Sequence, residues 1–187
     1  MKAYADAWLG SSSPLGTDSV TLSPYLGFES LRPALDLADE NDRGTFVLAL
    51  TSNPEGKSVQ HVGASESGHS GESGGAVAKR IIAAATAENA SRQWEQMGPC
   101  GLVVGATVGQ ALVDLGIDLS VFNGPILSPG YGAQGASAAD LYRVFAGVES
   151  QVLVNSSRGV LAAGPSVEGL AQAAQAARDD LLAARGA

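Results

Sequence analysis

The chain has 187 residues, of which 45% are hydrophobic, 16% are charged and 5% are aromatic, and its one cysteine is Cys100. This apolar content excludes a disordered chain, and a single cysteine excludes a disulfide-held scaffold. The net charge of −8 argues against a nucleic-acid polymer as partner, and the chain has no apolar run of the roughly 20 residues that span a membrane.

Short runs rich in Val, Leu and Ile predict buried strands of a parallel sheet. Five such runs occur: Asp18–Leu22, Gly44–Thr51, Gly101–Ala106, Gly124–Ser128 and Gln151–Asn155. Helical patterns occupy Ala3–Leu9, Glu29–Glu40, Glu72–Gln96, Val108–Leu115, Ala138–Ala146 and Val167–Ala184. Ser166 is a candidate N-cap for the last helix. The alternation predicts one α/β domain over residues 1–187 with right-handed crossovers.

The polar segment Gly56–Gly75 follows the second predicted strand and is too long for an ordinary strand-to-helix connection. It is either a plain surface loop or a mobile loop that closes over a ligand. The second alternative has a physical basis, because ligands in parallel α/β folds bind at the carboxyl ends of the strands.

Small and hydrogen-bonding residues follow the second, fourth and fifth predicted strands. The candidate binding residues among them are Ser52, Pro129, Gly130, Gln134, Ser157 and Arg158. Gly130, Gly132 and Gly135 allow the backbone to approach a ligand closely. The Arg158 guanidinium, beside the N–H groups of a turn, is suited to bind an anion.

Several other chemistries are not expected. The run Gly101–Thr107 has neither the glycine spacing nor the lysine of a nucleotide-binding loop. His61 and His69 lie eight residues apart in a polar segment, which does not predict a metal site. Ser52 lacks evident His and Asp partners, so it is a better hydrogen-bond donor than nucleophile. Cys100 precedes a strand, which predicts a structural role, and an unpaired cysteine is typical of the reducing cytoplasm.

Taken together, these segments resemble the orotidine 5′-phosphate decarboxylase family, in its bacterial subgroup with a longer chain. The matching stretches are Asp18–Gly27, Ala49–Gly56, Gly101–Thr107, Ile126–Gly135 and Val154–Leu161. The likeness extends over nearly the whole chain. Its most specific part is the proline–glycine–glutamine segment followed, at this spacing, by the arginine segment.

The resemblance implies a partial TIM (β/α)8 barrel, with the five strands as barrel strands four to eight. It implies a cytoplasmic homodimer with active sites at the dimer interface. The family converts orotidine monophosphate to UMP and carbon dioxide in pyrimidine biosynthesis, without a metal or an organic cofactor. Ser52 matches the serine that bonds the pyrimidine, Gln134 the glutamine that reaches from base to phosphate, and Arg158 the phosphate arginine. The segment Gly56–Gly75 matches the mobile phosphate loop.

One departure from the family pattern concerns the chemistry itself. The family signature Asp-x-Lys-x-x-Asp, which supplies the proton donor, does not occur in this sequence, and neither Lys57 nor Lys79 lies near a suitable pair of aspartates. The chain is therefore expected to be a carboxyl-terminal part of the enzyme that is inactive alone. With two unpaired edge strands and an uncovered interior face, the chain alone is also expected to be prone to aggregation or partly molten, unless a partner covers those edges.

Three alternatives remain open at this stage. The first alternative for the function is a non-catalytic remnant that binds phosphate or a nucleotide. The second is a related phosphate-sugar decarboxylase or synthase on the same barrel. For the fold, the residue patterns taken without the resemblance also permit an open five-stranded sheet of the flavodoxin type.

Overall fold

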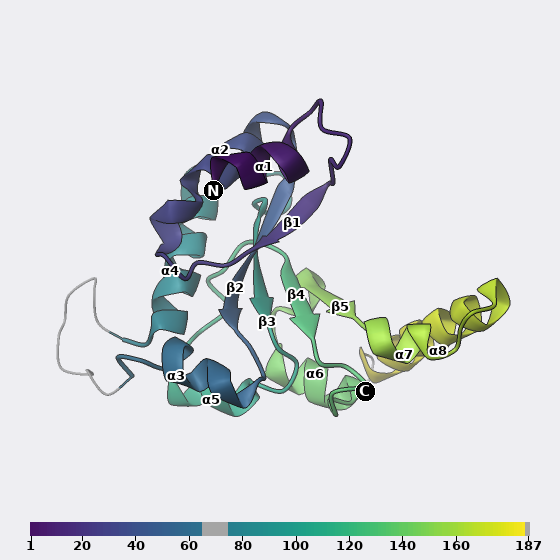
Figure 1. Cartoon of the computed structure of the whole chain (residues 1–187). Helices are drawn as coiled ribbons and strands as arrows, with labels where there is room; N and C mark the ends of the chain where they lie inside the picture. Colours follow the sequence, from purple (N-terminus) through teal and green to yellow (C-terminus); the bar gives the residue numbers. More distant parts are fainter. Residues whose placement is uncertain (65–74, 186–187) are drawn as a thin grey trace.

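The computed structural model describes residues 1–64 and 75–185, which are built around a five-stranded sheet (Figure 1). The strands are β1 (Ser19–Leu22), β2 (Gly44–Leu50), β3 (Cys100–Val104), β4 (Ile126–Pro129) and β5 (Val152–Asn155). All neighbouring strands pair in parallel, and the spatial order β1-β2-β3-β4-β5 follows the chain. A flavodoxin-type sheet has its first strand in the interior, whereas β1 lies at an edge, so the observed strand order excludes the flavodoxin alternative. Consecutive parallel strands in chain order are the arrangement of a barrel segment.

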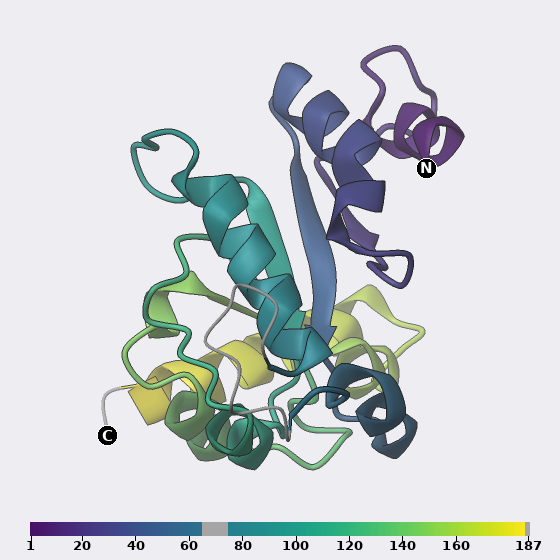
Figure 2. The ribbon, with the colours of Figure 1, turned by 90° about the vertical axis from the view of Figure 1, so that its left-hand side faces the viewer.

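Helices connect the strands. They are α1 (Lys2–Leu9), η1 (Phe28–Leu31), α2 (Arg32–Glu40), η2 (Pro54–Gly56), α3 (Lys57–Gln60), α4 (Val77–Ala90), α5 (Gly109–Asp114), α6 (Ala138–Val144), η3 (Glu149–Gln151), α7 (Ser157–Leu161) and α8 (Val167–Arg185). Among them, α1, α2 and α4 pack on the sheet. Figure 2 shows α4 alongside β2 and β3, against which it packs. The predicted cap of α8 is confirmed, because the Gly169 N–H donates to Ser166 Oγ at 3.1 Å.

The helix predicted over Glu72–Gln96 is shorter in the structure. It begins at Val77 and ends at Ala90, while its predicted start lies outside the described residues. Tertiary hydrogen bonds explain the early end. The buried Asn89 side chain donates to the Cys100 carbonyl at 2.9 Å and accepts from the Cys100 N–H at 3.1 Å, while Trp94 Nε1 donates to the Asn89 carbonyl at 2.8 Å. These bonds fold residues 91–99 back toward β3.

The predicted mobile segment Gly56–Gly75 contains regular structure at its start. The helix α3 occupies Lys57–Gln60, and a turn follows it to residue 64. Residues 65–74, including His69, lie outside the described part of the chain, so the prediction of a mobile loop stays a prediction. Among the described helices, none has the length and apolar character needed to cross a membrane.

The two faces of the sheet differ in burial. Residues paired in register point to the same face, so each face can be followed as a row across four strands. The helix-covered row consists of Val47, Leu102, Ile126 and Val152. The open row consists of Leu48, Val103, Leu127 and Leu153. Leu102 and Ile126 are fully buried, whereas the open row is buried only at its centre, where Val103 is 4% exposed, and is exposed at its ends, where Leu48 is 36% and Leu153 is 51% exposed. The main core therefore lies on the helix side of the sheet.

This asymmetry predicts unequal costs for truncating two leucines of the sheet. Leu102→Ala removes a fully buried side chain and should lower the free energy of unfolding by about 2–5 kcal/mol. Leu153→Ala removes a half-exposed side chain and should cost less than about 1 kcal/mol. Urea unfolding of both variants measures the difference. Equal costs would contradict the assignment of an open face, because they would require that face to be covered in solution.

Candidate functional site

Residues far apart in the sequence meet at the carboxyl ends of the strands. Ser52 follows β2 and Gln134 follows β4, and Ser52 Oγ donates a hydrogen bond to Gln134 Oε1 at 3.3 Å across a separation of 82 residues. Both side chains are exposed, so a ligand can reach them. The structure thus brings together two of the predicted binding residues.

A polar network fixes the chain around Ser52. The Thr51 N–H donates to Gln60 Oε1 at 2.9 Å, and Gln60 Nε2 donates back to Thr51 Oγ1 at 2.7 Å. Gln60 belongs to α3, so this short helix anchors the end of β2. The Thr51 hydroxyl in turn donates to Asn53 Oδ1 at 2.6 Å, which holds the turn on the other side of Ser52.

The end of β3 joins the two sides of the site. The Gly105 N–H donates to the Leu50 carbonyl at 2.9 Å, and the Ala106 N–H donates to the Pro129 carbonyl at 2.8 Å. Gly105 lies so close to Ser52 that an added Cβ would stand 3.3 Å from the Ser52 backbone nitrogen. A residue without a side chain therefore leaves room for Ser52 between β2 and β4. Sequence analysis did not single out Gly105.

The connection after β4, here called the glycine loop (residues 129–136), is closed by its own backbone. The Gly132 N–H donates to the Ala136 carbonyl at 2.9 Å, and the Ala136 N–H donates to the Gly130 carbonyl at 3.2 Å. Gly130 has a φ of 120° and Gly135 a φ of 99°, in the region that side chains disfavour. These glycines therefore shape the turn, as expected of turn-forming residues after a strand, while their close approach to a ligand stays a prediction.

The glycine loop ends where α6 begins, at a capping box. The Ser137 side chain accepts from the Asp140 N–H at 3.1 Å, and the Ser137 N–H donates to Asp140 Oδ2 at 3.1 Å. The Ser137 hydroxyl also donates to Asp140 Oδ2 at 2.6 Å, and this bond, followed by the bond from the Ser137 N–H, lowers the pKa of Asp140. The loop is thus held between a strand at one end and a capped helix at the other.

A small pocket of about 70 Å³ lies between the glycine loop and α7. Its walls are Pro129, Gly130, Tyr131, Ala133, Gln134, Asn155, Ser156, Ser157 and Arg158. The structure therefore places five of the six predicted binding residues around one pocket, with Ser52 joined to it through Gln134. About 10–15 Å³ of such a volume is enough to hold one water molecule, so the pocket has room for a small anion.

Arg158 is the positive charge of this pocket. Its side chain is exposed, and among the described residues it makes no ion pair, whereas Arg143 on α6 pairs with Asp140 at 2.9 Å. The guanidinium is thus available to an anion. The N–H groups of the first turn of α7 also lack intrahelical acceptors and add donors on the same side.

Tyr131 is a further residue of the pocket that sequence analysis missed. Its hydroxyl donates to Asp180 Oδ2 on α8 at 2.7 Å. Burial, followed by the hydrogen bond to Asp180, raises the pKa of Tyr131 to about 12. The phenol therefore remains a donor at neutral pH. A tyrosine in a glycine-rich turn gives no sequence signal for a partner 49 residues away.

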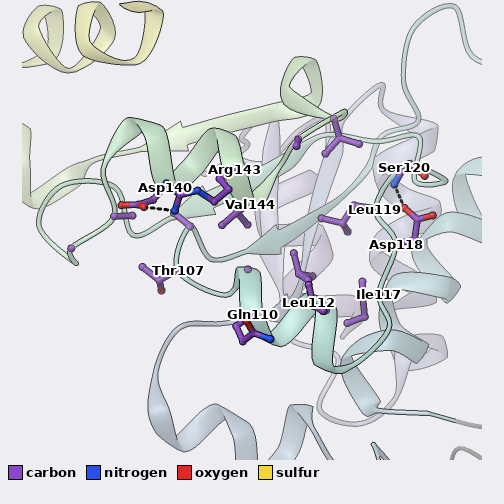
Figure 3. Close-up of a pocket in the computed structure, with 17 residues that line it drawn as sticks. Thr107, Gln110, Leu112, Ile117, Asp118, Leu119, Ser120, Asp140, Arg143 and Val144 are labelled. Carbon is purple, nitrogen blue, oxygen red and sulfur yellow. Dashed lines mark hydrogen bonds and ion pairs between the residues drawn. The ribbon is translucent and has the colours of Figure 1, made fainter. Parts of the chain in front are cut away.

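A larger cavity of about 650 Å³ lies between α5 and α6, and none of the six predicted residues lines it (Figure 3). Its floor includes the apolar Leu112, Leu119 and Val144, and the Asp140–Arg143 ion pair lies at one side. The charged groups of this ion pair already satisfy each other. The small pocket, with its unpaired arginine, is therefore the better candidate for an anionic ligand.

The remaining reactive side chains lie away from the small pocket. Cys100 is buried at the start of β3, and burial raises the pKa of its thiol to about 12, which keeps the nucleophilic thiolate form scarce. His61 lies in the turn after α3. Within residues 1–64 and 75–185, no three His, Cys, Asp or Glu side chains are grouped so that they could hold a metal ion.

Comparisons with known proteins all indicate the same family. The model of the orotidine 5′-phosphate decarboxylase / HUMPS family matches residues 1–173. The orotidine 5′-phosphate decarboxylase of Streptomyces coelicolor is 50% identical over 175 residues, which are 93% of this chain and 58% of that protein. That of Salinispora arenicola is 49% identical over 182 residues, which are 97% of this chain and 61% of that protein. The chain thus spans about three fifths of the length of these curated relatives.

Solved structures agree with these relatives. A crystal structure from Streptomyces avermitilis, assigned to the same decarboxylase, superposes with a TM-score of 0.86 at 48% identity and covers 100% of this chain and 61% of that chain. The UMP synthase of Leishmania donovani has a TM-score of 0.69 at 28% identity, over 98% of this chain and 36% of that chain. The partial-barrel fold predicted from the sequence is confirmed by the strand order and by these superpositions.

Proposed function

We propose that this chain, which belongs to the orotidine 5′-phosphate decarboxylase / HUMPS family, supplies the part of an orotidine 5′-phosphate decarboxylase that grips the nucleotide. The observation that carries the proposal is the continuous line of side chains from Ser52 through Gln134 to Arg158. Ser52 bonds Gln134, and Gln134 shares the small pocket with Arg158. A ligand with a polar base at one end and a phosphate at the other matches this line.

Each residue in this line has a separate task. The phosphate lies in the small pocket, where Arg158 forms charge-assisted hydrogen bonds and Pro129, Gly130 and Ser157 form the walls. The pyrimidine lies outside it, where the Ser52 hydroxyl exchanges its present bond for one to the base. Gln134 lies between them and contacts both ends of the ligand.

The chemical step removes the carboxylate of orotidine monophosphate and leaves UMP and carbon dioxide. It requires a proton donor at the carbon that loses the carboxylate. The proposal assigns Arg158 to the phosphate and Ser52 to the base, while the 187 residues contain no Asp-x-Lys-x-x-Asp segment to supply that proton. Binding at the phosphate assists such chemistry only when the reacting groups are also in place.

Other functions of the fold are less well supported. A phosphate-sugar decarboxylase or synthase would need no group for a pyrimidine, whereas Ser52 and Gln134 are paired at the base end of the site. A non-catalytic nucleotide-binding role shares the same pocket and differs only in the absence of turnover. The homodimer and the cytoplasmic location that the family implies stay predictions.

Removing the guanidinium should weaken nucleotide binding. A hydrogen bond to a charged group contributes about 1.5–3 kcal/mol, so Arg158→Ala should weaken UMP binding by roughly 10- to 150-fold in titration calorimetry. Arg143→Ala is the matched control, because Arg143 is paired with Asp140 and lies outside the small pocket, and its UMP affinity should not change. Unchanged affinity in Arg158→Ala would contradict the phosphate assignment.

Ser52→Ala tests the base end of the same site. The loss of one neutral hydrogen bond should weaken UMP binding by about three- to tenfold and leave inorganic phosphate binding unchanged, because the phosphate contacts stay intact. Competition of UMP and phosphate for a fluorescent nucleotide measures both affinities. A variant that loses phosphate binding to the same extent would show that Ser52 does not act on the base.

The missing proton donor predicts the absence of turnover. A polypeptide of these 187 residues should bind UMP but should not consume orotidine monophosphate, as followed by the loss of its ultraviolet absorbance. Fusion to the amino-terminal part of a full-length relative, which carries the Asp-x-Lys-x-x-Asp segment in the family pattern, should produce activity. Turnover by the unfused chain that scales with protein and survives repurification would contradict this prediction.

A further inference from the structure

The inference concerns Tyr131 and Asp180, which the proposed function does not use. Tyr131 lies on the glycine loop and lines the small pocket, and its hydroxyl donates to Asp180 on α8 at 2.7 Å. A hydroxyl that donates to a carboxylate forms a short, charge-assisted bond, about twice as strong as a neutral one. This bond therefore joins the pocket to an element that lies outside it.

The helix α8 has few other ties to the fold. None of its side chains is buried, and it projects away from the sheet while packing on α6 and α7 (Figure 1). Its other side-chain hydrogen bonds stay within the helix, from Gln172 to Glu168 and from Arg178 to Asp179. Among the described residues, the Tyr131–Asp180 bond is the only side-chain hydrogen bond that connects α8 with another element.

The helix α8 contacts both sides of the small pocket. One side is the glycine loop, which bears Gln134 and is tied to α8 through Tyr131. The other side is α7, which bears Arg158 and packs directly on α8. Both sides of the pocket are thus in contact with the same helix.

We propose that Tyr131 and Asp180 are a positioning pair that fixes the glycine loop relative to α7, so that Gln134 and Arg158 reach the same phosphate. The proposal rests on the proposed function, since it assumes a phosphate in the small pocket. The pair touches no reacting atom. Its effect is confined to the phosphate end of the ligand, while the base end at Ser52 is held by α3 through Gln60 and Thr51.

The test compares UMP with uridine, which lacks the phosphate, by titration calorimetry on the full chain. Tyr131→Phe and Asp180→Ala should each weaken UMP binding by about three- to tenfold and leave uridine binding unchanged. The double variant should be no weaker than either single one, because both remove the same bond. Asp180→Asn keeps a carbonyl acceptor and should restore most of the affinity for UMP.

Two matched controls separate positioning from general damage. Tyr142→Phe removes the hydroxyl of a half-buried tyrosine outside the small pocket, and Asp179→Ala removes the neighbouring carboxylate on α8, which pairs with Arg178. Neither should change the affinity for UMP. Thermal unfolding of every variant shows whether a loss of affinity follows a loss of stability.

The outcomes distinguish this proposal from the proposed function. If Arg158→Ala weakens UMP binding and Tyr131→Phe does not, the positioning pair is wrong and the phosphate site stands. Equal weakening of UMP and uridine binding, or additive losses in the double variant, would also overturn the pair. If the unaltered chain binds no UMP, or if Arg158→Ala has no effect, the proposed function fails and the pair fails with it.

Discussion

The candidate site depends on the parallel pairing of consecutive strands. Because each strand pairs with the next one in the chain, all carboxyl ends lie at one edge of the sheet. The register between β4 and β5 pairs Pro129 with Asn155, so the glycine loop and α7 begin side by side. This pairing is why residues from two connections line one pocket. Between β2 and β4, Gly105 bonds to the end of β2 and Ala106 bonds to the glycine loop, so the middle strand sets the spacing across which Ser52 meets Gln134.

The same sheet explains where the stability of the chain comes from. On the helix-covered side, α2 and α4 pack on β2 and β3, where Val47 and Leu102 are fully buried, and the buried Asn89 joins α4 to the backbone of Cys100. The open row ends in exposed leucines, Leu48 at 36% and Leu153 at 51%, and β1 and β5 each have a single partner strand in the described sheet. The core therefore supports the carboxyl edge from the helix side alone. The segments that follow β2 and β4 are held in addition by hydrogen bonds of their own, namely the Thr51–Gln60 network and the capping box at Ser137.

Features with a local cause could be predicted from the sequence. Continuous apolar runs gave all five strands to within about two residues at each end, and Ser166 indicated the start of α8 through ordinary capping. Features with a tertiary cause could not. The end of α4 depends on Asn89 and Trp94, which bond across a turn, and the short helices α3 and α7 have too few apolar residues to show a period. The Tyr131–Asp180 bond joins two segments whose proximity exists only in the folded chain.

The contacts that shape the site also show how its binding groups are separated from the rest of the chain. Ser52, Gln134 and Arg158 are placed by β2, β3, β4, β5 and the connections that follow them, and α8 rests against that set. The amino-terminal elements α1 and α2 pack on each other and on β1 or β2, away from the small pocket. Under the proposed function, a phosphate held at the far end of the ligand supplies binding energy, and the reacting groups must convert that energy into rate. The part of the chain described here holds the proposed phosphate-binding groups in a fixed arrangement. On the two proposals together, strand register and the contacts of α8 set the position of the phosphate, and the segment that carries out the proton transfer does not.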